Sequence, residues 1–142
     1  MSAPQVTAMH RDLAGPDGPI AILIVENDAL VAAEMKSILA AAGAEVVGVA
    51  ASFDEALEKC EHVRPGLALI DLALDGPKDG IELAQQLSDR LGVKSIFVTG
   101  HSDPKSVARG ASVAPLSWIK KPFGPGTLVA AVQLAIRDLH RR

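Results

Sequence analysis

The sequence has 142 residues and a single cysteine, Cys60, which cannot form a disulfide within the chain. No apolar run approaches the ~20 residues that a membrane-spanning helix needs. The first residues lack the basic, apolar and small-residue parts of a signal peptide. The net charge is −3, with acids and bases interspersed, so neither a nucleic-acid nor a membrane surface is indicated. We therefore expect a cytoplasmic protein that binds no nucleic acid and no membrane.

One domain fits the length and the composition, which is 49% hydrophobic and 22% charged. Residues 1–18 are rich in glycine, proline and polar side chains and show no period, which predicts a flexible N-terminal leader. Residues 19–142 then form the domain, which is large enough to bury a core without disulfides or metal.

Five short apolar runs follow from Ile20, and their two-sided apolarity and β-branched residues are typical of strands covered on both faces. The runs read IAILIV, AEVVGVA, GLALID, VKSIFVT and APLSWIK. The segments between them predict helices over 28–42, from Ser52 to about Glu61, around 81–91, around 128–139, and a weaker one over 104–109 that Gly110 ends.

This alternation of strand and helix predicts an α/β fold with a doubly wound, five-stranded parallel sheet and right-handed crossovers. Four of the five strands end in polar residues that could bind a ligand or take part in catalysis. They are Glu26 with Asn27 after the first strand, Asp71 at the third, Thr99 at the fourth and Lys121 after the fifth. In the flavodoxin-like strand order 2-1-3-4-5, these four ends meet in one cleft, where such sheets bind ligands.

These side chains suit phosphoryl transfer. Carboxylate and carbonyl oxygens with room for water suit Mg²⁺, which takes one or two carboxylates and keeps several waters. A lysine and a hydroxyl suit the oxygens of a phosphoryl group, and Asp71 can act as an oxygen nucleophile. A small α/β enzyme or nucleotide-binding protein is less well supported, because ENDALVAAE lacks a glycine-rich loop after the first strand.

Each residue by itself also has a structural explanation. Glu26 and Asp28 could simply cap the helix that follows. Thr99 could be present only because threonine favours strands, Lys121 could be a solvated lysine, and Trp118 could fill space in the core or on the surface. Asp71 is different, because a carboxylate between apolar runs must be paired, solvated or functional.

Four motifs occur in the order of one known family: ILIVE at the first strand, LALIDLAL around Asp71, VTG at the fourth and KPF at the fifth. With them the chain resembles a bacterial response-regulator receiver domain over about residues 19–140. The resemblance implies phosphorylation of Asp71, a Mg²⁺ site, and assistance by the domain in its own phosphorylation and dephosphorylation rather than separate enzyme activity. By position it implies that Glu26 and the Ala73 carbonyl bind metal and that Lys121 binds phosphate. Thr99 corresponds to the family's switch hydroxyl and Trp118 to its rotating aromatic residue. The peptide bond at the position of Lys121–Pro122 is often cis in this family.

Two departures from the family pattern stand out. The second of two usual acids after the first strand is Asn27, which offers a carbonyl oxygen without charge. The motif FVTGH and the polar loop after Asp71 resemble the FxTG subgroup common in alphaproteobacteria, which tends to have a short fourth helix. That subgroup implies a sensor histidine kinase of the HWE or a related type as partner.

We therefore expect a stand-alone response regulator, because no output domain follows the receiver in this sequence. Such a protein signals by contact with a downstream protein, or drains phosphate from a kinase, and we expect a monomer or weak dimer. The alternative is a degenerate receiver, in which Asn27 has spoiled the metal site and the domain binds a partner without phosphorylation.

Overall fold

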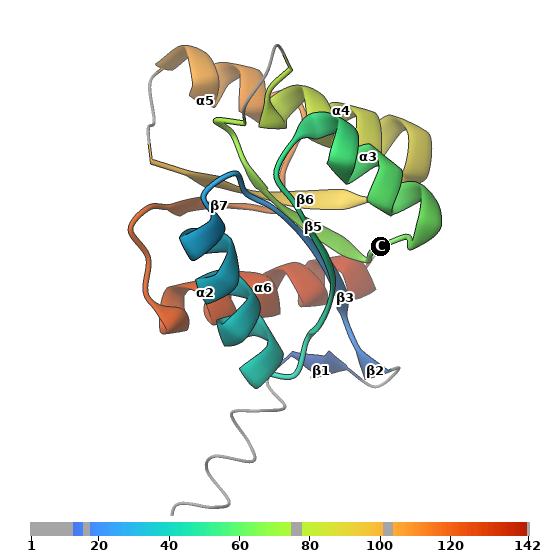
Figure 1. The fold of residues 1–142 in the computed structure, drawn as a ribbon, viewed down its shortest axis with the longest axis vertical. Helices are drawn as coiled ribbons and strands as arrows, with labels where there is room; N and C mark the ends of the chain where they lie inside the picture. The colour runs from blue at the N-terminus through green and yellow to red at the C-terminus, as the bar shows by residue number, and fades with distance from the viewer. Residues whose placement is uncertain (1–12, 16–17, 75–77, 101–103, 142) are drawn as a thin grey trace, which may run out of the picture.

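The computed structural model describes residues 13–15, 18–74, 78–100 and 104–141. Its elements are drawn in Figure 1. In chain order they are β1 (Ala14–Gly15), β2 (Gly18–Pro19), β3 (Ala21–Val25), α2 (Ala29–Ala41), β4 (Glu45–Ala50), α3 (Phe53–His62), β5 (Leu67–Asp71), α4 (Gly80–Leu91), β6 (Lys94–Thr99), α5 (Pro104–Ala111), β7 (Ser117–Lys120) and α6 (Pro125–His140).

The main sheet has five parallel strands in the order β4-β3-β5-β6-β7. Every residue of β5 is buried, since this central strand has neighbours on both edges and helices on both faces. The strand order 2-1-3-4-5 and the doubly wound α/β fold predicted from the sequence are therefore confirmed.

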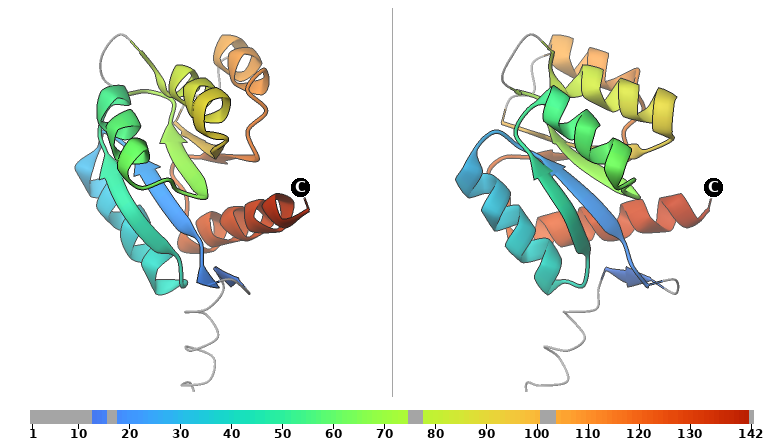
Figure 2. Two further views of the ribbon diagram at one scale, coloured as in Figure 1. Left: turned by 90° about the vertical axis from the view of Figure 1, so that its right-hand side faces the viewer. Right: turned by 45° about the vertical axis from the view of Figure 1, so that its right-hand side comes forward.

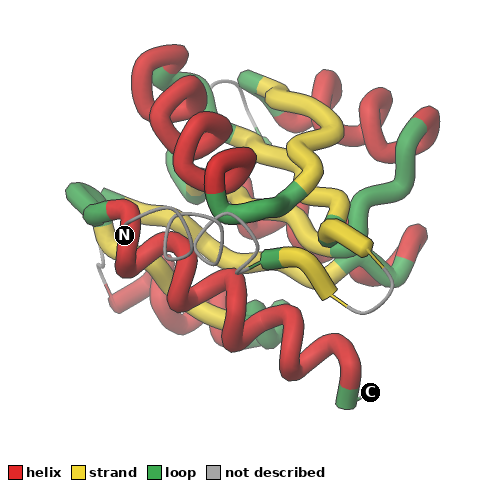
Figure 3. The backbone as a smooth tube through the Cα atoms, turned by 90° about the horizontal axis from the view of Figure 1, so that it is seen from below, coloured by secondary structure: helices red, strands yellow, loops and turns green. Residues whose placement is uncertain are grey.

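Alternate residues of each strand enter two separate cores. On β3, Ile22 and Ile24 pack with residues of α2 and α6, whereas Leu23 and Val25 pack with residues of α3 and α4. This follows from the two-residue period of a strand, and it explains why the strands are apolar on both faces. Figures 2 and 3 show helices lying on both sides of the sheet, and the colours of Figure 2 place α5 on the side of α3 and α4.

Polar side chains fix the starts of the helices where the sequence predicted caps. Asp28 precedes α2 and accepts hydrogen bonds from the N–H groups of Leu30 and Val31. Ser52 precedes α3 and accepts one from the N–H of Glu55, whose carboxylate reaches back to an N–H one residue before the cap. Capping satisfies N–H groups that have no partner in the first turn.

Two helix boundaries differ from the prediction. Helix α5 continues through Gly110 to Ala111, because Gly110 is buried against neighbouring aromatic rings and has a packing role. Helix α6 begins earlier than the apolar pattern indicated, with Gly124 as N-cap and Pro125 opening its first turn. Among the described residues, no helix combines the length and the apolar character that crossing a membrane requires.

The end of the predicted leader also differs from expectation. Leu13 is only 1% exposed and packs in the core beside α2 and α6, and its N–H donates to the Ala42 carbonyl over 2.8 Å. Strands β1 and β2 pair antiparallel immediately after it. The flexible leader was therefore a wrong prediction for this part, because one apolar side chain and a short hairpin suffice to order it; residues 1–12 lie outside the described part of the chain.

Candidate functional site

The predicted site residues follow the carboxyl ends of neighbouring strands. Glu26 comes directly after β3, Asp71 and Thr99 are the last residues of β5 and β6, and Lys121 follows β7. The N–H of Lys121 donates to the Thr99 carbonyl over 2.8 Å, which ties the start of the β7–α6 loop to β6. In Figure 1 these ends lie on one edge of the sheet, where α2 begins.

The ammonium of Lys121 lies between two carboxylates. Its Nζ is 2.6 Å from Glu26 Oε1 and 3.2 Å from Asp71 Oδ2. The two acid side chains are only 1% and 6% exposed, whereas that of Lys121 is 23% exposed. The structure thus brings together the three charged residues that the sequence singled out.

Backbone N–H groups hold the other oxygens of both acids. The N–H of Ala73 donates to Asp71 Oδ1 over 3.0 Å, and the N–H of Asp28 donates to Glu26 Oε2 over 3.1 Å. Each carboxylate is therefore anchored on one oxygen by the chain that follows its strand. The opposite oxygen of each faces Lys121.

The pKa values of this cluster reflect its burial. Burial is the main reason that the pKa of Glu26 is raised above its usual value, and the negative charge of Asp71 adds to this, whereas Lys121 opposes it. For Lys121, burial by itself lowers the pKa, but the ion pairs with Glu26 and Asp71 together outweigh burial and hold the pKa above its usual value.

The donor set fits a hard cation that keeps most of its water. Among the described residues, none gives the buried Glu26 Oε1 a hydrogen bond of good geometry, although the Lys121 ammonium lies 2.6 Å away. The described part of the chain holds no group of three His, Cys, Asp or Glu side chains placed to hold a metal ion, so a cation at this site would also need backbone or amide oxygens and water. Two carboxylates plus backbone or amide oxygens suit Mg²⁺. Asn27 is exposed beside Glu26, in a pocket that both residues line.

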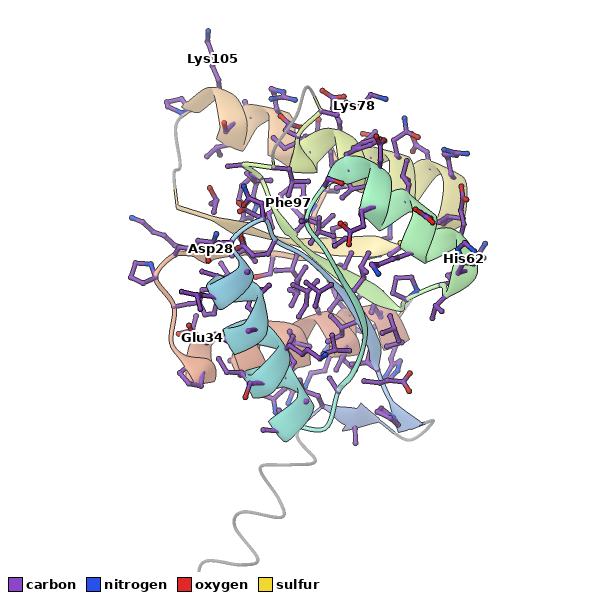
Figure 4. All side chains as sticks on the ribbon, in the orientation of Figure 1. Asp28, Glu34, His62, Lys78, Phe97 and Lys105 are labelled. Atoms are coloured by element: carbon purple, nitrogen blue, oxygen red, sulfur yellow. The ribbon has the colours of Figure 1, made fainter. Side chains whose placement is uncertain are left out.

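Thr99 and Trp118 share one face of the sheet with Phe97. Thr99 is 8% exposed at the end of β6, two residues after Phe97 and so on the same face. Trp118 on β7 is 36% exposed, and its ring meets that of Phe97 edge to face with centroids 5.1 Å apart. Phe97 is labelled near the centre of the molecule in Figure 4. Trp118 is therefore packed on one side and open to solvent on the other.

Sequence reasoning missed one residue close to Asp71. Gly80, the first residue of α4, donates its N–H to the Leu72 carbonyl over 3.1 Å. A Cβ at this position would overlap the Asp71 carbonyl oxygen and would lie 2.8 Å from Ile70 Cγ2. Only glycine lets α4 approach the backbone of β5 so closely. The Asp-Gly pair in front of an amphipathic helix was the available signal.

A five-stranded parallel sheet in this order, with an aspartate, a glutamate and a lysine meeting at its carboxyl edge, defines the receiver class of signalling protein. The chain belongs to that family, because the model of the response regulator receiver domain matches residues 22–133.

Two curated relatives and one solved structure illustrate the similarity. The chain is 29% identical over 118 residues to the transcriptional regulatory protein PdtaR of Mycobacterium tuberculosis, covering 83% of this chain and 57% of PdtaR. It is 32% identical over 127 residues to the phyllosphere-induced regulator PhyR of Methylorubrum extorquens, covering 89% of this chain and 46% of PhyR. The chain thus spans about half the length of these relatives. The signal receiver domain of a modulated diguanylate cyclase from Desulfovibrio desulfuricans superposes with a TM-score of 0.82 at 32% identity, covering 87% of this chain and 98% of that one.

Proposed function

We propose that this chain is a phospho-acceptor response regulator that receives a phosphoryl group on Asp71 in a Mg²⁺-dependent reaction. The observation that carries the proposal is the position of Asp71, a buried carboxylate 3.2 Å from the ammonium of Lys121, which also pairs with Glu26. A structural ion pair has no need of two acids around one lysine at the ligand edge of a parallel sheet.

The reaction would use the side chains as follows. An oxygen of Asp71 attacks the phosphorus of a phosphohistidine, so that a P–O bond forms while the P–N bond breaks and the histidine nitrogen leaves. The Ala73 N–H keeps the Asp71 carboxylate oriented, since it already holds Oδ1 at 3.0 Å. The Lys121 ammonium neutralises charge on the phosphoryl oxygens, and the Thr99 hydroxyl donates to one of them.

Glu26, Asp71, the Ala73 carbonyl and Asn27 are the residues that would hold Mg²⁺, which neutralises the charge that gathers on a transferring phosphoryl group. Once attached, the phosphoryl group adds about −1.5 to −2 charges and three acceptor oxygens near Thr99. We expect Thr99 to turn toward it and Trp118 to repack in the space released.

For partners, we propose a sensor histidine kinase of the HWE or a related type, as the FVTG motif suggests, acting in the cytoplasm. The resemblance to PhyR, a regulator by its name, supports a role in regulation. The phosphorylated protein would act as a monomer or weak dimer, without binding nucleic acid or membrane. It would either contact a downstream protein or drain phosphate from the kinase.

The test is phosphorylation with acetyl phosphate and Mg²⁺, in wild type and in Asp71→Asn. We expect a hydroxylamine-sensitive phosphate on the wild type and none on Asp71→Asn. Asp54→Asn, which changes an exposed aspartate on α3, is the matched control and should label normally. Wild-type labelling of Asp71→Asn would show that another residue is the acceptor.

A second function remains in view because Asn27 stands where the family usually has an acid. In that case the domain binds its partner without phosphorylation. A wild-type protein that takes up no phosphate from acetyl phosphate or from any candidate kinase, yet binds a partner, would support this alternative.

A further inference from the structure

Two consecutive residues of α5 contact two different parts of the molecule. Arg109 Nη1 lies 2.9 Å from Asp79 Oδ2, across thirty positions of the sequence, and the two side chains are 51% and 31% exposed. The next residue, Gly110, is the only buried residue of the eight in α5. The position of α5 is thus fixed in part through each of these two contacts.

The Asp79 side of this arrangement leads to Asp71. Asp79 is the N-cap of α4, and its other oxygen, Oδ1, accepts a hydrogen bond from the Glu82 N–H over 3.0 Å. Gly80 follows directly and packs against the carbonyl of Asp71. The carboxylate that binds Arg109 is therefore rigidly placed next to the backbone of the acceptor strand.

The Gly110 side leads to Trp118. A Cβ on Gly110 would overlap the far edge of the indole, at 2.8 Å from Cζ2, and would lie 3.2 Å from Phe97 Cε2. The backbone of α5 consequently rests directly on the indole ring. A shift of α5 must change the surroundings of Trp118, and a shift of the indole must displace α5.

We propose that the Asp79–Arg109 ion pair is a strut that transmits the state of Asp71 to α5 and, through Gly110, to the Trp118 indole. This route runs through α4 and α5 and is separate from the Thr99 hydroxyl. It rests on the proposed function, because phosphoryl uptake at Asp71 is the event transmitted. Asp79 and Arg109 are positioning residues that do not touch the phosphoryl group.

The exposure of the pair determines how large its effect can be. Exposed ion pairs add little to folding stability. Asp79 is already held by its capping bond, so less side-chain freedom is lost when Arg109 binds it. We therefore expect breaking the pair to speed amide exchange in α5 by roughly two- to fivefold and to leave the free energy of global unfolding nearly unchanged.

The experiment compares Arg109→Gln and Asp79→Asn with the wild type. Asparagine caps helices as well as aspartate does, so Asp79→Asn removes the charge and keeps the cap. Lys105→Gln is the matched control, because Lys105 lies on the same helix and points away from the molecule in Figure 4. Arg109→Lys tests rescue by a residue that keeps the charge. The probe is beryllofluoride with Mg²⁺, its loading is followed by fluorine NMR, and the readouts are Trp118 emission and amide exchange in α5.

We expect both strut variants to bind beryllofluoride within twofold of the wild-type affinity but to lose at least half of the change in Trp118 emission. Lys105→Gln should keep the full change, and Arg109→Lys should recover part of it. A full change in both strut variants would overturn the strut. So would an unchanged Trp118 emission in loaded wild type.

Failure of the proposed function gives a different pattern. If the wild type loads neither beryllofluoride nor phosphate, the proposed function fails, and the strut is judged from amide exchange in the free protein. Faster exchange of α5 in both strut variants, with Lys105→Gln like the wild type, supports the part of the strut that does not depend on phosphorylation, namely that the ion pair holds α5 against α4. Equal exchange in all four proteins overturns it.

Discussion

Lys121 Nζ lies closer to Glu26 Oε1, at 2.6 Å, than to Asp71 Oδ2, at 3.2 Å. The nearer partner of this lysine is thus the proposed metal ligand and not the proposed phosphate acceptor. The ammonium occupies the region between the two carboxylates where a divalent cation would be attracted. Binding of Mg²⁺ and the Lys121–Glu26 pair therefore compete for the same oxygen.

Replacing Lys121 with methionine should strengthen Mg²⁺ binding while it weakens phosphorylation. One competing positive charge disappears, so we expect the Kd for Mg²⁺ to fall by roughly fivefold or more. The measurement should be made at pH 8 or above, because Lys121 lowers the pKa of buried Glu26 and its loss lets that pKa rise further. Calorimetry provides the affinity, and Lys120→Met on the exposed neighbour is the control. Weaker Mg²⁺ binding in Lys121→Met would contradict the competition.

Restoring an acid beside Glu26 should tighten Mg²⁺ binding in a second way. In Asn27→Asp a charged ligand replaces an amide, which should strengthen binding by about 1–3 kcal/mol. Without metal, the added charge crowds the carboxylates and should lower the melting temperature. Asn27→Gln, which keeps the amide, should show neither effect. Equal or weaker affinity in Asn27→Asp would indicate that Asp28, or Asp75 outside the described residues, supplies the charge.

A methyl group at Gly80 should damage both stability and phosphorylation. The added Cβ of Gly80→Ala would overlap the Asp71 carbonyl and lie 2.9 Å from Leu72 Cα, and backbone atoms cannot move aside as a flexible side chain can. We expect a loss of roughly 1–3 kcal/mol in urea unfolding, together with slower labelling. Gly126→Ala in α6, where the same atom meets nothing within 4 Å, is the control and should be neutral or stabilising. An unchanged midpoint in Gly80→Ala would show that the backbone adapts.

Cys60 should make the stability of the protein fall more steeply with rising pH than that of a variant without the thiol. Burial raises the pKa of this thiol, which is 2% exposed on α3. From the ordinary value of about 8.5 upward, the unfolded chain loses the thiol proton while the folded protein keeps it, so stability falls as pH rises. Urea unfolding between pH 7.5 and 10 should therefore show a steeper decline for the wild type than for Cys60→Ala. Parallel pH profiles would mean that the thiol ionises equally in both states.

The strands and the polar residues at their ends were predictable, because strand periodicity and polar strand ends depend only on neighbouring residues. The order of the strands was predicted from the flavodoxin-like pattern and not from local rules. The apolar runs on both faces of β3 and β5 indicated a parallel sheet, and Asp71 between apolar residues indicated the end of the sheet at which a functional site was expected. The capping roles of Asp28 and Ser52 were equally local. Such features follow from rules that span a few positions of the chain.

Contacts between distant parts of the chain were not predictable. The burial of Leu13 depends on α2 and α6, and nothing near residue 13 indicates them. Gly110 was predicted to end its helix, because its packing partner, the Trp118 indole, belongs to β7, which follows later in the chain. The Asp79–Arg109 pair likewise depends on how α4 and α5 are placed, which a single sequence does not specify.

The burial of Leu13 beside the C-terminal end of α2 determines where a truncated version of this protein can begin. A shortened version that starts at Ile20 would leave out a core side chain and the β1–β2 hairpin, so expression should begin upstream of Leu13. The hairpin also lies at the opposite end of the sheet from the carboxyl end of β5, where Asp71 is the last residue, as the course of the strands in Figure 1 shows. A protein immobilised on a biosensor surface through the β1–β2 hairpin would therefore present the carboxyl ends of its strands, with the proposed acceptor Asp71, to a kinase in solution.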